Sequence, residues 1–283
     1  MTTTVSPHAG GPGRLGDLTV SRIGYGVMQL ERLRGDRDAA IGLLRRAREL
    51  GVTHVDTAQF YGDGFVNELI RDAYGPDDGV TVVTKVGADP HPGGEIPLRP
   101  AQKPDELRAS VHANLRALGT DRIPVVNLRR LNDRGPGIRA DADQIVDVDD
   151  QLAALVALRE EGVIGAIGLS GASLATVRRA LPAGLVCVQN LYSLVDRDDE
   201  DILRLCTEEG IAWVPYFPLG GAFPGRPKVT DDPGVLEQAA ARSCTPSQYG
   251  LAWLLYHAPN VLLIPGTASV AHLEENIALP TLE

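Results

Sequence analysis

An acid, a phenol and an amine follow two short apolar segments of this 283-residue chain. The segment His54–Asp56 is typical of a buried strand that ends on a carboxylate, and Tyr61 comes five residues later; the run Val80–Thr84 is followed by Lys85. Because the carboxyl ends of neighbouring parallel strands meet at one edge of a sheet, these side chains are expected to form one polar cluster. An ammonium group beside a phenol makes it a stronger acid, able to protonate a carbonyl oxygen. In isolation, the same residues fit a solvated tyrosine and an unrelated ion pair better.

Apolar runs that predict strands alternate with amphipathic segments that predict helices, from residue 20 almost to the end. Most of the runs are continuously hydrophobic, which is typical of parallel strands covered on both faces. The predicted strands are Ile23–Gly26, His54–Asp56, Val80–Thr84, Pro124–Leu128, Ala166–Leu169, Val186–Gln189, Ala212–Tyr216 and Val261–Ile264. The predicted helices are one that ends at Leu50 and those at Pro104–Leu118, Asp150–Glu161, Leu174–Leu181, Asp198–Glu209, Pro246–His257 and Val270–Ile277.

This alternation fits either an open doubly wound sheet or a (β/α)₈ barrel. The strand count favours the barrel, and Gly24–Gln29 lacks the Gly-x-Gly-x-x-Gly pattern of a dinucleotide-binding open sheet. We therefore predict a single-domain α/β fold, a (β/α)₈ TIM barrel over residues 17–283, after a flexible leader at residues 1–16. A hairpin around Leu15–Val20 should cap the barrel floor. Long loops at residues 86–103, 130–148 and 217–234 should rise on the face where barrel active sites lie.

Composition narrows the range of partners. The net charge is −10 without clusters of Lys and Arg, which argues against nucleic acid, and no apolar run approaches the ~18 residues of a membrane span. Cys187, Cys206 and Cys244 are scattered, which is typical of reduced thiols in the cytoplasm. His54 and Asp56 share a strand face but lack further metal ligands, so we assign no metal. We expect a cytoplasmic monomer that acts on a small molecule.

Further motifs coincide with the acid, phenol and amine in a consistent order along the chain. They are Val20–Gly26, Asp56-Thr57-Ala58-x-x-Tyr61-Gly62, Thr84-Lys85, Ile167–Ser170, Gln189–Leu194, Pro215–Gly220, Ile264–Thr267 and Glu274–Asn276. With these motifs, the chain resembles the aldo-keto reductases from about Leu18 to its end. The resemblance implies a (β/α)₈ barrel that binds NADPH and reduces aldehydes and ketones.

The resemblance also implies a role for each matching position. Tyr61 would donate the proton, Lys85 would make its hydroxyl more acidic, and Asp56 would orient Lys85. Tyr216 would stack on the nicotinamide, Ser170 and Gln189 would bind the carboxamide, and amides at Leu219–Gly221 would meet the pyrophosphate. The full set of implied cofactor-binding residues is Gly26, Met28, Gln29, Asp56, Ser170, Gln189, Tyr216, Pro218, Leu219, Gly221, Gly266, Thr267, His272, Glu275 and Asn276.

Two departures from the family pattern concern the adenosine phosphate. Gly266 stands where many relatives have Lys, and His272 stands where they have Arg. A threonine hydroxyl and a histidine hold a phosphate less firmly than Lys and Arg do. We therefore expect a modest preference for NADPH, with NADH left open as an alternative.

A third departure falls at the fourth strand, where Arg129 occupies the place of the family histidine. Three roles remain open for Arg129: it polarises the carbonyl or binds an acidic substrate group, it turns away or pairs with a carboxylate, or it marks a loss or change of activity. The leading hypothesis is an NADPH-dependent carbonyl reductase in which Asp56, Tyr61, Lys85 and Arg129 are catalytic. The alternatives are a nucleotide-binding regulatory or scaffold protein of the same fold, or an imine or carbonyl reductase in which Arg129 grips an anionic substrate.

Overall fold

Parallel strands curve into a barrel in the computed structural model, which describes residues 9–135, 137–221 and 225–282. Seven of them form one sheet in the spatial order β11 (Ala212–Trp213), β10 (Leu185–Gln189), β9 (Ile164–Ser170), β8 (Ile123–Arg129), β5 (Thr81–Val86), β4 (His54–Asp56) and β3 (Tyr25–Gly26). The segment that begins at Val261 closes the gap between the two edges. Val261 pairs with Trp213 on one side, and Leu263 pairs with Ile23 on the other. The predicted (β/α)₈ barrel is confirmed.

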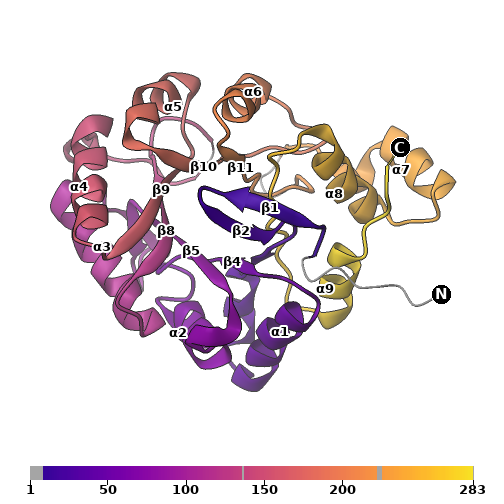
Figure 1. Ribbon diagram of the computed structural model, residues 1–283, viewed down its shortest axis with the longest axis horizontal. Coiled ribbons are helices and arrows are strands. Elements are labelled where there is room, and N and C mark those ends of the chain that lie inside the picture. Colours follow the sequence, from indigo (N-terminus) through magenta and orange to yellow (C-terminus); the bar gives the residue numbers. More distant parts are fainter. Residues whose placement is uncertain (1–8, 136, 222–224, 283) are drawn as a thin grey trace.

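Helices surround this barrel (Figure 1). They are α1 (Arg37–Glu49), α2 (Phe65–Ala73), α3 (Pro104–Leu118), α4 (Val148–Glu160), α5 (Leu174–Ala180), α6 (Glu200–Glu208), α7 (Pro233–Ala241), α8 (Pro246–His257) and α9 (Val270–Ile277). Most begin at a side chain that accepts a backbone N–H, as Ser173 does for α5 and Thr245 for α8. Helices α2 and α7 are absent from our predicted set. Gly64 precedes α2 without a side-chain cap, so the usual start signal is missing there.

Two buried layers hold the fold together. The larger lies between the strands and the helices, and includes Leu44 of α1 and Leu155 of α4. The smaller fills the barrel interior, where Val83, Val125 and Leu262 pack together. Burial on both faces explains why the strand sequences are continuously apolar.

The hairpin of β1 (Pro12–Leu15) and β2 (Leu18–Ser21) lies across one end of the barrel (Figure 1). Leu15 and Val20 belong to the buried cluster of the barrel interior, so the hairpin caps the floor as predicted. The predicted end of the flexible leader, residue 16, was wrong, because β1 already begins at Pro12. Residues 1–8 of that leader lie outside the described residues.

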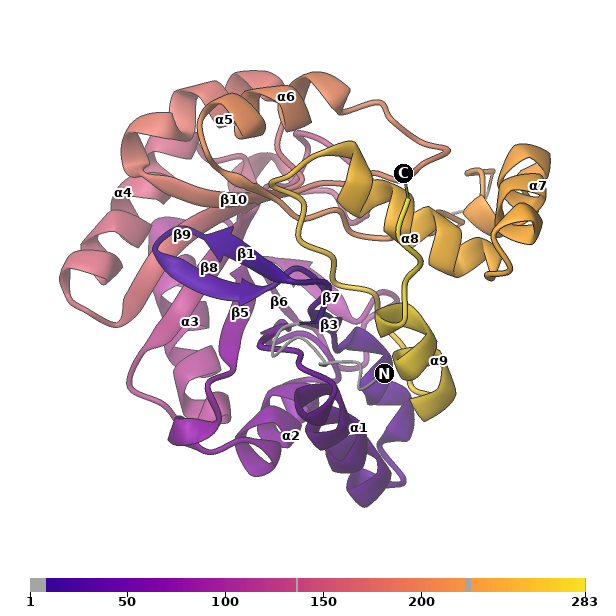
Figure 2. The same cartoon turned by 45° about the vertical axis from the view of Figure 1, so that its right-hand side comes forward.

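The predicted strands and loops need smaller corrections. The strand predicted at Ala212–Tyr216 ends at Trp213, because Pro215 has no N–H to donate; Tyr216 rejoins the sheet through a single bridge to Leu191. The loop at residues 86–103 contains a second hairpin, β6 (Ala88–Pro90) with β7 (Leu98–Pro100). The loop at residues 217–234 leads into α7. Figure 2 shows that α7 lies outside the ring of helices around the barrel, beside α8. Among the described residues, no helix is both long and apolar enough to cross a membrane.

Candidate active site

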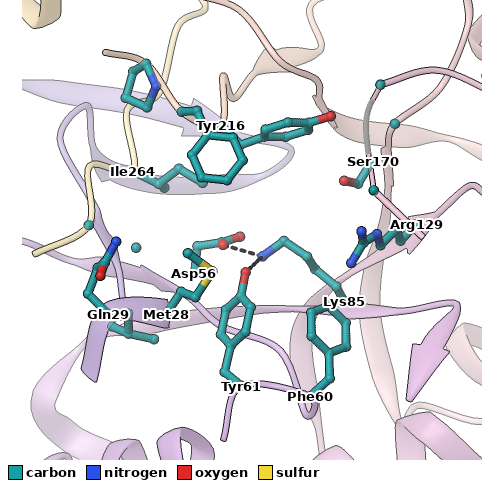
Figure 3. Close-up of a pocket in the computed structure, with 18 of the residues that line it drawn as sticks. Met28, Gln29, Asp56, Phe60, Tyr61, Lys85, Arg129, Ser170, Tyr216 and Ile264 are labelled. Atoms are coloured by element: carbon teal, nitrogen blue, oxygen red, sulfur yellow. Dashed lines mark hydrogen bonds and ion pairs between the residues drawn. The ribbon is translucent and has the colours of Figure 1, made fainter. Parts of the chain in front are cut away.

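Asp56, Tyr61 and Lys85 meet at the carboxyl ends of β4 and β5. Lys85 Nζ donates to Oδ1 of Asp56, to the carbonyl oxygen of Thr57 at 3.1 Å and to the hydroxyl of Tyr61 at 3.3 Å. Figure 3 shows the ammonium between the carboxylate and the phenol. The cluster predicted from the strand ends is therefore present in the structure.

Lys85 is 6% exposed and Asp56 is 3% exposed, so this ion pair is almost entirely withdrawn from water. Burial by itself lowers the pKa of Lys85, but Asp56 and then Tyr61 outweigh it and the net shift is upward. The ammonium therefore keeps its charge throughout the neutral and mildly alkaline range.

Gln189 reaches this cluster from the end of β10. Its Nε2 donates to Oδ2 of Asp56 at 2.7 Å, while its Oε1 is buried and has no hydrogen-bond partner among the described residues. A buried carbonyl oxygen without a donor is costly, and a ligand amide would satisfy it. This orphaned acceptor fits the predicted binding of a carboxamide, although Gln189 lies beneath the cavity wall rather than in it.

The loop that carries Tyr61 is fixed by a largely buried polar network that our sequence reasoning missed. Asn67 of α2 accepts from the Thr57 hydroxyl at 2.8 Å and donates to Gln59 at 2.8 Å and to Asn114 of α3 at 3.0 Å. Asn114 also accepts from Thr84, the neighbour of Lys85, at 2.6 Å. The only sequence signal was an asparagine within an apolar helix face, which does not reveal its partners.

A cavity of about 800 Å³ opens above the cluster, within the usual range for small-molecule sites. Its walls come from the loops at residues 86–103, 130–148 and 217–234 and from the segment after the eighth strand. Of the predicted site residues, the cavity is lined by Gly26, Met28, Gln29, Asp56, Tyr61, Lys85, Arg129, Ser170, Tyr216, Pro218, Leu219, Gly266, Thr267, His272, Glu275 and Asn276. Gln189 and Gly221 are the exceptions.

Arg129 points into this cavity from the end of β8 (Figure 3). Its guanidinium lies 5.5 Å from the centre of the Phe60 ring, and no carboxylate among the described residues is within ion-pairing distance. The hypothesis that Arg129 turns away or pairs with a carboxylate is therefore wrong for this structure. Burial lowers the pKa of Arg129, but a guanidinium does not lose its proton in a protein.

Tyr216 faces the cluster of Asp56, Tyr61 and Lys85 across the cavity, and Ser170 lies beside Arg129 (Figure 3). Tyr216 and Ser170 line the same cavity as Lys85. Close approach of the backbone shapes the same wall: a Cβ atom at Gly26 would lie 2.4 Å from the carbonyl oxygen of Ile264, and one at Gly266 would lie 2.8 Å from that of Gly26. A side chain at either position would force the first and eighth strands apart in this structure.

The predicted amide contacts to the pyrophosphate need correction. The N–H of Gly220 donates to Phe217 at 2.8 Å, and the N–H of Gly221 donates to Pro227 at 3.0 Å. Both amides are therefore already engaged, and Gly221 packs against Lys228 instead of lining the cavity. Their φ angles of 70° and 69° explain the two glycines as turn residues.

The predicted adenosine-phosphate residues gather around the start of α9. Ser269 caps this helix by accepting the N–H of His272, and the hydroxyl of Thr267 accepts the N–H of Ser269 at 3.1 Å. His272 is exposed on the first turn, where helix N–H groups favour an anion. Glu275 is held by Thr245 and Asn276 is buried. The described residues contain no group of three or more His, Cys, Asp and Glu side chains placed to hold a metal ion.

The chain is similar over most of its length to known proteins of one family. The model of the aldo/keto reductase family matches residues 22–282. A pyridoxine 4-dehydrogenase from Escherichia coli is 42% identical over 275 residues, which cover 95% of this chain and 92% of the relative. An aldo-keto reductase named yakc [NADP(+)] from Schizosaccharomyces pombe is 30% identical, with 93% and 84% covered. A crystal structure of an aldo-keto reductase from Klebsiella pneumoniae in complex with NADPH superposes with a TM-score of 0.78 at 26% identity, covering 96% of this chain and 90% of that one.

The chain belongs to the aldo/keto reductase family. It is an oxidoreductase that depends on NADP(H), which confirms the predicted family, enzyme class and cofactor.

Proposed function

We propose that this protein transfers a hydride from NADPH to the carbonyl carbon of an aldehyde, with Tyr61 as the proton donor. The observation that carries the proposal is the contact of one buried ammonium, Lys85, with both the phenol of Tyr61 and the carboxylate of Asp56. This cluster lies at the base of the cavity, opposite the ring of Tyr216.

NADPH, when bound, supplies the hydride. Tyr61 gives its hydroxyl proton to the carbonyl oxygen, which becomes the hydroxyl of the product alcohol. Lys85 stabilises the tyrosinate that remains, and Asp56 holds the ammonium in place. In the oxidising direction the same tyrosinate takes the proton back from the alcohol. Gln189 and Ser170 would hold the carboxamide of the cofactor, and the first turn of α9 would hold its phosphate.

We propose pyridoxal as the aldehyde, with pyridoxine as the alcohol. The support is the 42% identity with a pyridoxine 4-dehydrogenase, which extends over nearly the whole of both chains. The aromatic walls that Phe60 and Tyr216 give to the cavity suit a flat ring.

The test measures whether a hydride passes from NADPH to pyridoxal. The purified protein is incubated with pyridoxal and NADPH that carries deuterium in the transferred position. The proposal predicts loss of NADPH absorbance together with pyridoxine that carries one deuterium on the new alcohol carbon. Binding of NADPH without deuterium transfer to pyridoxal or to other aldehydes would contradict it, and would favour a nucleotide-binding scaffold.

A further inference from the structure

Among the described residues, Arg129 has no counter-ion, unlike three other cations that line the cavity. Lys85 contacts Asp56, Arg130 lies 3.9 Å from Asp133, and Arg134 Nε lies 2.6 Å from a carboxylate oxygen of Asp199. No carboxylate within the described ranges pairs with Arg129, although its side chain is largely withdrawn from solvent. A charge held partly out of water without a partner costs free energy, and an anion bound beside it would recover that energy.

The surroundings of Arg129 leave its guanidinium free to meet a ligand. One face lies over the ring of Phe60, with 5.5 Å between the guanidinium carbon and the ring centre. Its Nη2 lies next to the backbone of Gly137, where a Cβ atom would come within 2.9 Å. The planar guanidinium group is therefore flanked by the Phe60 ring and by the backbone of Gly137, and it points into the cavity (Figure 3).

The position of Arg129 limits which anion it can bind. The guanidinium carbon lies 5.5 Å from the centre of the Phe60 ring, and that ring lies 5.2 Å from the ring of Tyr61, so Arg129 and Tyr61 flank the same part of the cavity. Because Tyr61 marks the place of the carbonyl oxygen, an anion at Arg129 must sit within a few bonds of that carbonyl. A phosphate at the far end of a substrate would not reach it. The ring of Phe60, which packs edge-to-face with that of Tyr61 at 5.2 Å between centres, favours an aromatic substrate at this place.

We propose that Arg129 selects aromatic aldehydes that carry an ionised hydroxyl on the ring carbon next to the aldehyde, by binding that phenolate. The inference rests on the proposed aldehyde reduction and names its substrate class. Pyridoxal has this arrangement, since its 3-hydroxyl adjoins the 4-aldehyde. A phenolate in that position feeds negative charge into the carbonyl and opposes the arrival of a hydride. A guanidinium neutralises the charge, and its fork can contact the phenolate and carbonyl oxygens together.

The experiment compares 2-hydroxybenzaldehyde with 4-hydroxybenzaldehyde, using NADPH at a pH where both hydroxyls are ionised. Both substrates conjugate a phenolate with the carbonyl, but only the first places it beside the carbonyl. We expect kcat/KM to favour the 2-hydroxy compound by about tenfold or more, and Arg129→Met to reduce this ratio to within about twofold of unity. Arg129→Lys keeps the positive charge but loses the two parallel N–H donors of the guanidinium. It should therefore give a ratio of kcat/KM values between those of the wild type and Arg129→Met.

Arg204→Met is the control, because Arg204 is an exposed arginine of α6 that does not line the cavity. It should leave the ratio unchanged. In the wild type, 2-methoxybenzaldehyde should show no advantage over 4-methoxybenzaldehyde, a measurement that does not depend on any variant folding. An equal preference in the wild type and in Arg129→Met, or a preference for the 2-methoxy compound, would overturn the inference. Failure to reduce pyridoxal or any benzaldehyde would instead contradict the proposed function.

Discussion

Gln189 and Lys85 hold opposite oxygens of the same carboxylate. The amide of Gln189 donates to Oδ2 of Asp56 at 2.7 Å, and the ammonium of Lys85 donates to Oδ1. Gln189 therefore links β10 to the carboxyl ends of β4 and β5, while its own Oε1 is buried and has no hydrogen-bond partner among the described residues. We expect this one side chain to orient the Asp56–Lys85 pair and to accept a hydrogen bond from the carboxamide of the cofactor.

We predict that Gln189→Met lowers kcat/KM for aldehyde reduction by about tenfold or more, because Asp56 loses a donor and the carboxamide loses an acceptor. The dissociation constant of NADPH, measured by fluorescence quenching, should rise in parallel. Gln238→Met on the outlying helix α7 is the control and should match the wild type. Unchanged NADPH binding in Gln189→Met would show that Gln189 does not contact the cofactor.

His272 is expected to provide the preference for NADPH over NADH. A guanidinium binds a phosphate through two parallel hydrogen bonds, so His272→Arg should raise the ratio of kcat/KM values for the two cofactors by about tenfold. His272→Ala should lower it. His112→Arg, on α3 and outside the cavity, adds the same charge elsewhere and should leave the ratio unchanged. A wild-type enzyme that favours NADH by about tenfold or more would contradict the expected preference.

Asn67 is expected to matter for stability. Its side chain is fully buried and makes hydrogen bonds to Thr57, Gln59 and Asn114. Asn67→Ala leaves the buried Thr57 hydroxyl without its acceptor and removes the donor to Asn114 and Gln59, so the free energy of unfolding should fall by about 2–4 kcal/mol. Glu68→Ala, at the neighbouring half-buried position where the side chain makes only a long ion pair with Arg37, should change it by less than about 0.5 kcal/mol. Denaturant unfolding measures both, and a similar small effect for the two variants would refute the role of the network.

His54 should make the protein less stable in acid. Burial lowers the pKa of His54 to about 4, from an ordinary value of 6.5. Below pH 6.5 the unfolded chain therefore binds a proton that the folded chain does not, and folding loses free energy until the pH reaches about 4. The loss amounts to about 3 kcal/mol.

His54→Gln removes this proton, so the difference in unfolding free energy between variant and wild type should shift in favour of the variant as the pH falls from 6.5 to 4. Other groups titrate equally in both proteins and cancel in the difference. A difference that stays constant over this range would mean that His54 has an ordinary pKa in the folded protein.

Much of the fold was predictable because each element carries a local signal. The helices at Pro104–Leu118, Pro246–His257 and Val270–Ile277 have the predicted bounds, and each begins at a proline or at a capping serine or threonine. Helix α2 lacks such a cap and was missed. The eighth strand was predicted as a continuous run, but it joins the barrel through isolated bridges, to Trp213 on one side and to Ile23 and Gly26 on the other.

The site was predictable to the extent that it depends on strand ends. Asp56 and Lys85 follow apolar runs, so the barrel itself brings them together. The hydrogen bonds from Asn67 to Asn114 and from Gln189 to Asp56 join residues far apart in sequence. No local sequence pattern predicts such bonds. The N–H groups of Gly220 and Gly221 are hydrogen-bonded within the loop, which folds back on Pro227. The residue types alone do not predict this folding.

The most direct test of the account is the turnover of Tyr61→Phe with pyridoxal and NADPH, with the dissociation constant of NADPH measured alongside. The variant loses one hydroxyl and keeps the ring. We predict that kcat falls by about 10²–10⁴-fold, the range expected for removal of a general acid, while NADPH binding changes by less than about twofold. A variant that reduces pyridoxal at the wild-type rate would contradict the assignment of Tyr61 as the proton donor.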